Sequence, residues 1–288
     1  MPYLVHILIL FCIYAIIGIS LNLVVGYTGL ISIAHAVFST IGGYAVAILM
    51  TFYGWNFFLA MLVGVLVSAC VAWPIAWLLS RLTWDYYVLG TVGFNYVIYV
   101  VFLNWESLTR GPLGIPGIPR PTLGPLNFTS NYYFLILALL FATAAYLFAR
   151  YLVRTSFGRV LKAIREDEQA LRVFGYETTR YKVAIFVIAA MLAAMAGALA
   201  ASFLRFLDPT AAALMDSIFA VSIVILGGVA NLEGSILGAL VLVAFPELMR
   251  FVGFSEDIAG QMRQLFYGLL LIIMMRWRPQ GLMGEYKL

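Results

Sequence analysis

The first 80 residues of this 288-residue chain contain no Asp, Glu, Lys or Arg, and the first charged side chain is that of Arg81. Hydrophobic residues make up 64% of the sequence and charged residues 10%, whereas an ordinary soluble domain has roughly 25% charged residues. So little polar surface cannot cover a water-soluble particle, and we expect the chain to be integral to a membrane. Its basic residues form no stripe with interleaved aromatic residues, which argues against nucleic-acid binding.

Apolar segments follow one another along the whole chain, at about 3–25, 37–52, 57–80, 86–103, 132–153, 183–204, 214–229, 234–252 and 264–277. Continuous apolar runs near 20 residues long indicate helices, because the strands of a membrane barrel would alternate apolar and polar residues. We therefore predict an all-α polytopic membrane protein with about 8–10 transmembrane helices, some of them broken or re-entrant, in one transmembrane domain over residues 1–288.

The basic residues at the segment ends fall into two groups, with twelve on one side of the membrane and five on the other if each segment crosses once. The cytoplasmic side carries the excess of basic residues, so residues 154–182 and the C-terminus are predicted to be cytoplasmic. The loop at 104–131 then lies on the extracytoplasmic side. Its sequence RGPLGIPGIPRPTLGP predicts a folded, stiff and non-helical cap.

Residues 154–182 form a hydrophilic island that holds eleven of the chain's thirty charged residues. We predict a short amphipathic helix in it, capped by Ser156, beginning near Gly158 and closed by Gly175 in a left-handed turn. A helix lying on anionic lipid headgroups is one interpretation, but the acidic run at 166–168 would be repelled there. Mixed charge on the polar face favours a protein partner instead.

Two apolar stretches, 26–44 and 216–239, are too short or too rich in glycine to be simple spans. Unwound backbone at membrane depth is tolerated only where protein or a water-filled cavity satisfies its polar groups, so both stretches are predicted to wall a pathway, as in transporters built from repeats. The alternative is that the glycines merely permit close helix packing.

For an amino-acid solute, the N-terminal end of a broken helix supplies N–H groups to a carboxylate without a buried cation. The candidate pathway residues are Asn22, Gly26, Tyr27, Gly29, Ser32, His35 and Asn95. Two alternatives stay open, because His35 could instead satisfy unwound backbone and the two asparagines could form helix–helix hydrogen bonds.

Motifs for chemistry on this chain are missing from the sequence. It has no GxxxxGK[ST] phosphate loop, no HExxH and no convincing nucleophile and base pair, so we expect neither an enzyme nor a metal site. An ion-coupled carrier or channel is the alternative class, although such proteins normally need ionisable residues inside the membrane. A cytoplasmic docking element without a phosphate loop points to ATP hydrolysis by a separate subunit.

The stretch GRVLKAIREDEQALRVFGYETTRYKVAIFVIAAMLAAMAGALAA, which begins at Gly158, resembles the cytoplasmic loop and following helix of the M-type (LivM) permeases of branched-chain amino acid ABC importers. Further similar stretches are GYTG, LTRGPLGIPGIPRP, ILGGVANLEGSILGA, PELMR and RPQGLMG, so the resemblance covers essentially the whole chain. It implies that the ATPase-coupling residues are Gly158, Arg159, Ala163, Ile164, Arg165, Glu166, Asp167 and Gly175.

The resemblance implies a non-catalytic permease subunit that moves branched-chain or related small amino acids by alternating access. The expected location is a bacterial or archaeal plasma (inner) membrane. The implied partners are a second homologous permease, two ATP-binding subunits that carry ATP and Mg, an extracytoplasmic substrate-binding protein and membrane lipid, with no cofactor on this chain. The stretch GFNYV at 93–97 and Tyr99 depart from the family pattern, which leaves an amide, urea or another small carboxylate open as the solute.

Overall fold

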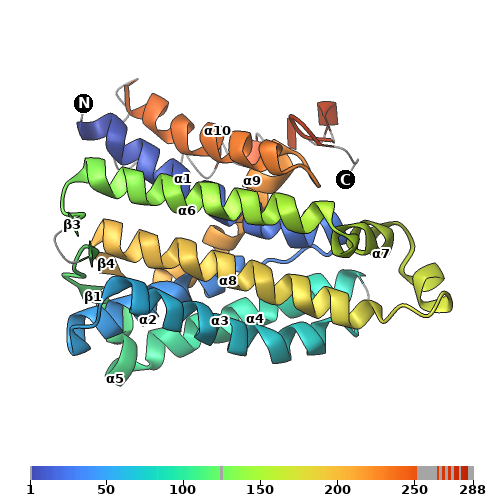
Figure 1. Ribbon diagram of the computed structural model, residues 1–288, viewed down its shortest axis with the longest axis horizontal. Coiled ribbons are helices and arrows are strands. Elements are labelled where there is room, and N and C mark those ends of the chain that lie inside the picture. The colour runs from blue at the N-terminus through green and yellow to red at the C-terminus, as the bar shows by residue number, and fades with distance from the viewer. Residues whose placement is uncertain are drawn as a thin grey trace.

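Long helices lie side by side along the longest dimension of the molecule, with short strands at one end and the helix α7 at the other (Figure 1). The computed structural model describes residues 2–82, 84–123 and 126–251, together with 265, 268–269, 272–273, 276–278 and 280–284. In chain order the helices longer than ten residues are α1 (Pro2–Thr28), α2 (His35–Tyr53), α3 (Phe57–Leu79), α4 (Trp84–Asn104), α6 (Asn131–Arg154), α7 (Ser156–Val173), α8 (Thr178–Leu204), α9 (Leu214–Gly227) and α10 (Leu232–Phe251). The predicted all-α polytopic membrane fold is confirmed.

Six of these helices are long and apolar enough to cross a membrane within the described ranges, namely α1, α2, α3, α4, α6 and α8. The pair α9 and α10 adds at most one more span, because the two helices are bent by 120° at a short break. The stretch 216–239 is therefore broken, as predicted, and 214–229 and 234–252 are not two independent spans. The last predicted segment, 264–277, falls mostly outside the described residues.

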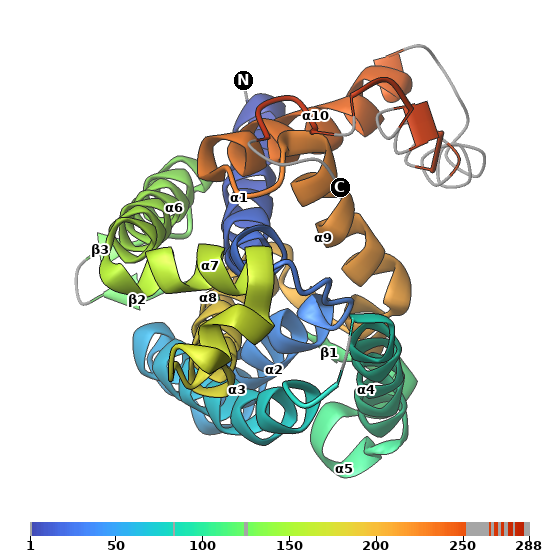
Figure 2. The ribbon, with the colours of Figure 1, turned by 90° about the vertical axis from the view of Figure 1, so that its right-hand side faces the viewer.

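The centre of the bundle is formed by α1 and α8, with α2 and α3 below them and α6, α9 and α10 around the rest in the end-on view of Figure 2. Small residues let α2 and α8 approach closely: a Cβ atom on Gly42 would overlap the Ala194 carbonyl, and one on Gly197 would overlap the Ser39 carbonyl. Such backbone contact is how helices gain packing energy in lipid, where burial of apolar surface gives little.

The loop 104–131 is folded, as predicted, and its Gly-Pro stretch from Arg110 onward contains no α-helix among its described residues, only one 3₁₀ turn. The loop contains the short helix α5 (Glu106–Thr109) and the 3₁₀ turn η1 (Gly111–Leu113), followed by the strands β1 (Ile115–Pro116), β2 (Thr122–Leu123) and β3 (Leu126–Asn127). Strand β1 pairs antiparallel with β4 (Phe206–Leu207), which follows α8, with Ile115 opposite Leu207. The loop is thus bonded through its backbone to the chain beyond α8.

The helix α7 crosses the opposite end of the bundle and begins two residues earlier than expected. Thr155, and not Ser156, is its N-cap residue, and the Thr155 hydroxyl donates to the Leu152 carbonyl of α6 in place of capping α7. The prediction for Gly175 is confirmed, since it has φ +84° and closes the helix with its N–H on the Arg172 carbonyl. The next helix, α8, starts within the hydrophilic island.

Candidate substrate pathway and coupling site

The chain between α1 and α2 is non-helical over residues 29–34 and lies inside the bundle. Gly29 turns the chain with φ +73°, and α2 then starts at His35, whose side chain is 1% exposed. The Ser20 hydroxyl of α1 lies 2.8 Å from His35 Nε2 and also donates to the Ile17 carbonyl. The hydroxyl donates only once, so His35 Nε2 is the donor of this pair and the imidazole is anchored on α1.

A polar junction holds the start of α2 against α4 and α9. Asn95 Oδ1, halfway along α4, accepts from the Ser217 hydroxyl at 2.8 Å, and Asn95 Nδ2 donates to the Ala212 carbonyl at 2.9 Å. Ser217 in turn accepts the Ala36 N–H of α2 at 3.2 Å. Four separate chain segments therefore meet at the level of Asn95.

The backbone N–H groups at the start of α2 already have protein partners. The Ile33 N–H donates to the Thr91 hydroxyl at 3.1 Å, and the Ala36 N–H goes to Ser217. Two buried side-chain atoms of this region have no hydrogen-bond partner among the described residues, namely Ser32 Oγ and His35 Nδ1. The two N–H groups are thus satisfied within the protein, whereas these two side-chain atoms are not.

Asn22 lies away from this junction and is hydrogen-bonded to the turn between α9 and α10. Its Nδ2 donates to the Asn231 carbonyl at 2.8 Å and to the Ser235 hydroxyl at 2.6 Å, and its Oδ1 accepts the Ala230 N–H at 3.0 Å. Gly26 packs against Ala230 so closely that a Cβ atom would overlap the backbone there. The predicted pathway residues therefore form two groups: Asn22, Gly26 and Tyr27 lie at the α9–α10 turn, and Ser32, His35 and Asn95 lie around the start of α2.

The helix α7 is anchored on α1 by its first half. Leu161 and Ile164 are buried in a cluster with Ile19 and Leu23 of α1, and Arg165 donates to the Gly26 carbonyl at the end of α1. Gly158 is buried against the end of α6, so closely that a Cβ atom would overlap the Val153 carbonyl. Of the predicted coupling residues, Gly158, Ile164 and Arg165 therefore attach α7 to the bundle.

The other predicted coupling residues divide between the two sides of α7. Arg159, Glu166 and Asp167 are exposed and Ala163 is half-buried. At Asp167 the helix is kinked, with φ −155° and ψ 97°, and the Asp167 carboxylate accepts the Ala170 N–H at 2.9 Å. Asp167 thus acts as the N-cap of a second helical segment, and that segment ends in an exposed apolar tip at Val173 and Phe174, which are 86% and 79% exposed.

The second half of α7 is bonded to α8 through Glu168. Its carboxylate accepts from Lys182 Nζ at 2.8 Å, from Arg172 at 2.7 Å and from the Thr178 hydroxyl at 2.9 Å. Burial opposes the charged form of Glu168, but these three donors outweigh it, so the pKa of this carboxyl lies below its ordinary value. Lys182 is 4% exposed and also donates to the Ser80 carbonyl at the end of α3.

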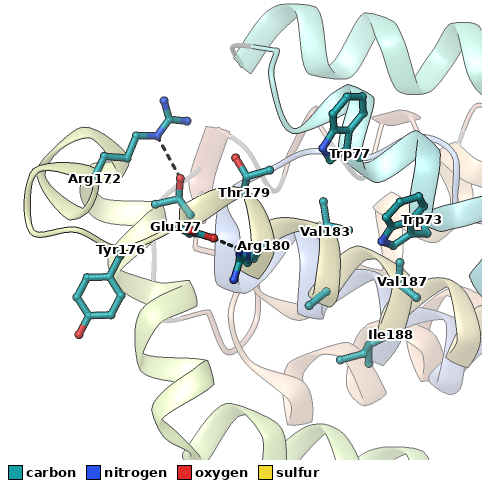
Figure 3. Close-up of a pocket in the computed structure, with 12 residues that line it drawn as sticks. Trp73, Trp77, Arg172, Tyr176, Glu177, Thr179, Arg180, Val183, Val187 and Ile188 are labelled. Carbon is teal, nitrogen blue, oxygen red and sulfur yellow. Dashed lines mark hydrogen bonds and ion pairs between the residues drawn. The ribbon is translucent and has the colours of Figure 1, made fainter.

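Two hollows flank this network at the α7 end of the bundle. A polar cleft of about 370 Å³ lies between α7, the end of α1 and the turn after α3, and is lined by residues that include Thr28, Arg81, Glu166 and Lys182. A wider hollow of about 990 Å³ lies between α3 and α8. In Figure 3 the indoles of Trp73 and Trp77 face Val183 and Val187 across it, an aromatic arrangement typical of the membrane interface.

Comparison with known proteins agrees with this architecture. The family model described as the permease component of branched-chain amino acid transport systems matches residues 3–275. The chain belongs to this permease family. It is 36% identical to the high-affinity branched-chain amino acid transport system permease protein LivM of Salmonella typhimurium, over 94% of this chain and 68% of that protein. It is 35% identical to LivM of Escherichia coli, with the same coverage.

The permease LivH of Escherichia coli is also similar, at 26% identity over 94% of this chain and 91% of that protein. No solved structure matches the chain. This permease is accordingly a LivM-type, multi-pass transport subunit. Two groups of residues that the sequence did not single out shape its candidate sites: Ser20, Thr91 and Ser217 around the start of α2, and Glu168 and Lys182 between α7 and α8.

Proposed function

We propose that this permease is one transmembrane subunit of an ATP-driven importer of branched-chain amino acids, which works by alternating access. ATP and Mg are bound by two separate ATPase subunits, a second similar permease completes the conduit, and an extracytoplasmic binding protein delivers the solute. The family match and the LivM and LivH relatives support the solute class and the pairing of two permeases. Residues 154–182 and 280–284, which lie at the same end of the bundle, face the cytoplasm.

The observation that carries this proposal is the position of α7, which lies across the ends of three helices and is bonded to the two central ones. Its first half is attached to α1 through Arg165 and the Gly26 carbonyl. Its second half is attached to α8 through Glu168 and Lys182. A displacement of α7 by a partner therefore reaches α1 and α8 separately, on either side of the kink at Asp167.

The chain after Gly26 explains how such a displacement would reach the pathway. The helix α1 ends at Thr28, and the unwound residues 29–34 lead directly to His35 and the polar junction at Asn95. A rigid helix transmits displacement, whereas an unwound segment absorbs it by changes of φ and ψ. We infer that residues 29–34 are the hinge at which movement of α1 relative to α2 opens one side of the pathway and closes the other.

Reconstitution of the permease pair with its ATPase in vesicles tests the proposal. ATP should drive uptake of leucine in the presence of the binding protein, and Glu166→Lys should weaken ATPase association while the protein still inserts. The matched control is Glu106→Lys, the same charge reversal at the exposed α5 on the opposite end, which should leave ATPase association unchanged. Uptake driven by an imposed proton or sodium gradient without any ATPase would contradict the proposal and favour an ion-coupled carrier.

A further inference from the structure

A carboxylate lies on an exposed face of this permease near the middle of the membrane. Asp216 is in the first turn of α9 and is exposed. The next residue, Ser217, donates to Asn95, which is the twelfth of the 21 residues of α4. Because α4 is long enough to cross the membrane, Asp216 lies close to mid-depth.

Such a position excludes contact with lipid. A charged side chain at the bilayer centre costs about 2.5–3.5 kcal/mol on insertion scales, so intramembrane carboxylates face a protein partner or a water-filled space. The exposed neighbours of Asp216 on α9 are the apolar Leu214, Met215 and Ile218. Within the described part of the chain, no hydrogen bond or ion pair engages the Asp216 carboxylate.

A cavity of about 240 Å³ adjoins Asp216 and extends between α1, α2, α8 and α9. Its walls are mainly aliphatic and aromatic, with Ile13 and Ile17 from α1, Leu204 from α8 and Phe219 from α9. Asp208 is the second carboxylate on the wall, and among the described residues no Lys, Arg or His lines the cavity. Two acidic groups beside apolar walls suit the ammonium group and the apolar side chain of a small solute.

The size and surroundings of the cavity narrow the class of ligand. Pockets for drug-sized ligands have about 300–1,000 Å³, so this smaller cavity suits a single amino acid. In the described part of the chain no group of three or more His, Cys, Asp or Glu could hold a metal ion. The Tyr44 hydroxyl, which is 3% exposed and without a hydrogen-bond partner, lies within electrostatic reach of Asp208.

We propose that Asp216, together with Asp208, receives the ammonium group of the transported amino acid in this cavity, with the aliphatic side chain of the solute against Ile13, Ile17 and Phe219. This inference rests on the proposed function. In this proposal the ammonium group is bound by the carboxylates of Asp216 and Asp208. Solute recognition then takes place at mid-depth, on the extracytoplasmic half of the bundle. The unpartnered atoms Ser32 Oγ and His35 Nδ1 lie nearer to the α7 end of the bundle than this cavity does.

Uptake measurements on the reconstituted complex test the role of Asp216. Asp216→Asn should reduce ATP-driven leucine uptake at least tenfold while the complex still assembles, and Asp216→Glu should retain most of the uptake. The control Asp85→Asn removes an exposed carboxylate near the start of α4 and should have no effect. Normal uptake by both Asp216→Asn and Asp208→Asn would overturn the inference, whereas failure of the wild-type complex to transport would contradict the proposed function itself.

Protection of an engineered cysteine separates recognition from a structural role. Ala211→Cys, placed on the half-buried wall in a background with Cys12→Ala and Cys70→Ala, should react with a small thiol reagent, and leucine should slow that reaction several-fold. The keto acid 4-methyl-2-oxopentanoate, which lacks the ammonium group, should give no protection, and Asp216→Asn should abolish protection by leucine. Equal protection by the keto acid, or protection by sodium alone, would overturn the inference.

Discussion

Lys182 of α8 and Glu168 of α7 form an ion pair of 2.8 Å in which the lysine side chain is only 3% exposed. The lysine side chain is almost fully buried, and the carboxylate and the Ser80 carbonyl accept its hydrogen bonds. A buried cation with defined partners fixes one geometry between two helices. The pair therefore determines how the second half of α7 sits on the central helix α8.

Replacement of the buried lysine should destabilise the permease. Lys182→Met leaves the Glu168 carboxylate without its main partner, and loss of hydrogen bonds to a charged group costs about 1.5–3 kcal/mol. The melting temperature of the purified protein should fall accordingly. Arg180→Met is the matched control, because the Arg180–Glu177 pair is 81% and 61% exposed and exposed pairs add little. Equal melting temperatures for the two variants would contradict this account.

The same pair predicts a pH dependence. The pKa of the Glu168 carboxyl is lowered in the folded protein from an ordinary value of 4.5, so its contribution to stability is present above about pH 4.5 and is lost as the pH falls through the lower folded value. Thermal melts of wild type and Glu168→Gln should therefore differ most near neutral pH and converge in acid. A difference that stays constant down to pH 3 would rule this out.

The apolar tip of α7 should contribute to ATPase association. Val173 and Phe174 are exposed without contact to the bundle that would bury them, and aromatic side chains on docking surfaces often contribute more than 1 kcal/mol. Phe174→Ala should weaken association about tenfold and leave the melting temperature unchanged. Leu113→Ala, an 81% exposed apolar residue at the opposite end, is the control. Binding assays that find both variants equal to wild type would argue against the tip as a contact.

Asn22 should behave as a structural residue. Asn22→Ala removes the bonds that hold the turn between α9 and α10 and leaves the buried Ala230 N–H without its acceptor, which costs about 1–3 kcal/mol. Its melting temperature should fall, whereas the leucine concentration for half-maximal uptake should not change. Asn104→Ala, whose exposed amide bonds only within its own helix, should melt like wild type. A change in that concentration with normal stability would restore Asn22 to the pathway.

The helices of this permease were predictable from sequence because apolar runs set their ends to within a few residues. The predicted segment 57–80 corresponds to α3 at Phe57–Leu79, and 132–153 corresponds to α6 at Asn131–Arg154. The breaks were predictable as well, since glycine marks both. The kink at Asp167 was not predicted, although Asp is a common N-cap residue.

The polar contacts between helices were not predictable, because they join residues far apart in the chain. Asn95 and Ser217 are separated by 122 positions, and Asn22 and Ser235 by 213. Nothing in the neighbourhood of either asparagine indicates its partner. The depth of Asp216 in the membrane was not predictable for the same reason. Its segment enters the bundle through η2 (Pro209–Ala212), and its depth follows only from the contact between Ser217 and Asn95.

The antiparallel pair of β1 and β4 connects the loop 104–131 directly to the interior of the molecule. Ile115 is hydrogen-bonded in register with Leu207, and the next residue along the chain is Asp208, on the wall of the cavity. A delivery protein that tilts residues 111–118 from outside would therefore pull on the main chain beside that carboxylate without any side chain as intermediary. If the proposed function holds, delivery of the solute at the surface and its binding halfway through the bilayer would be coupled through this short stretch of main chain.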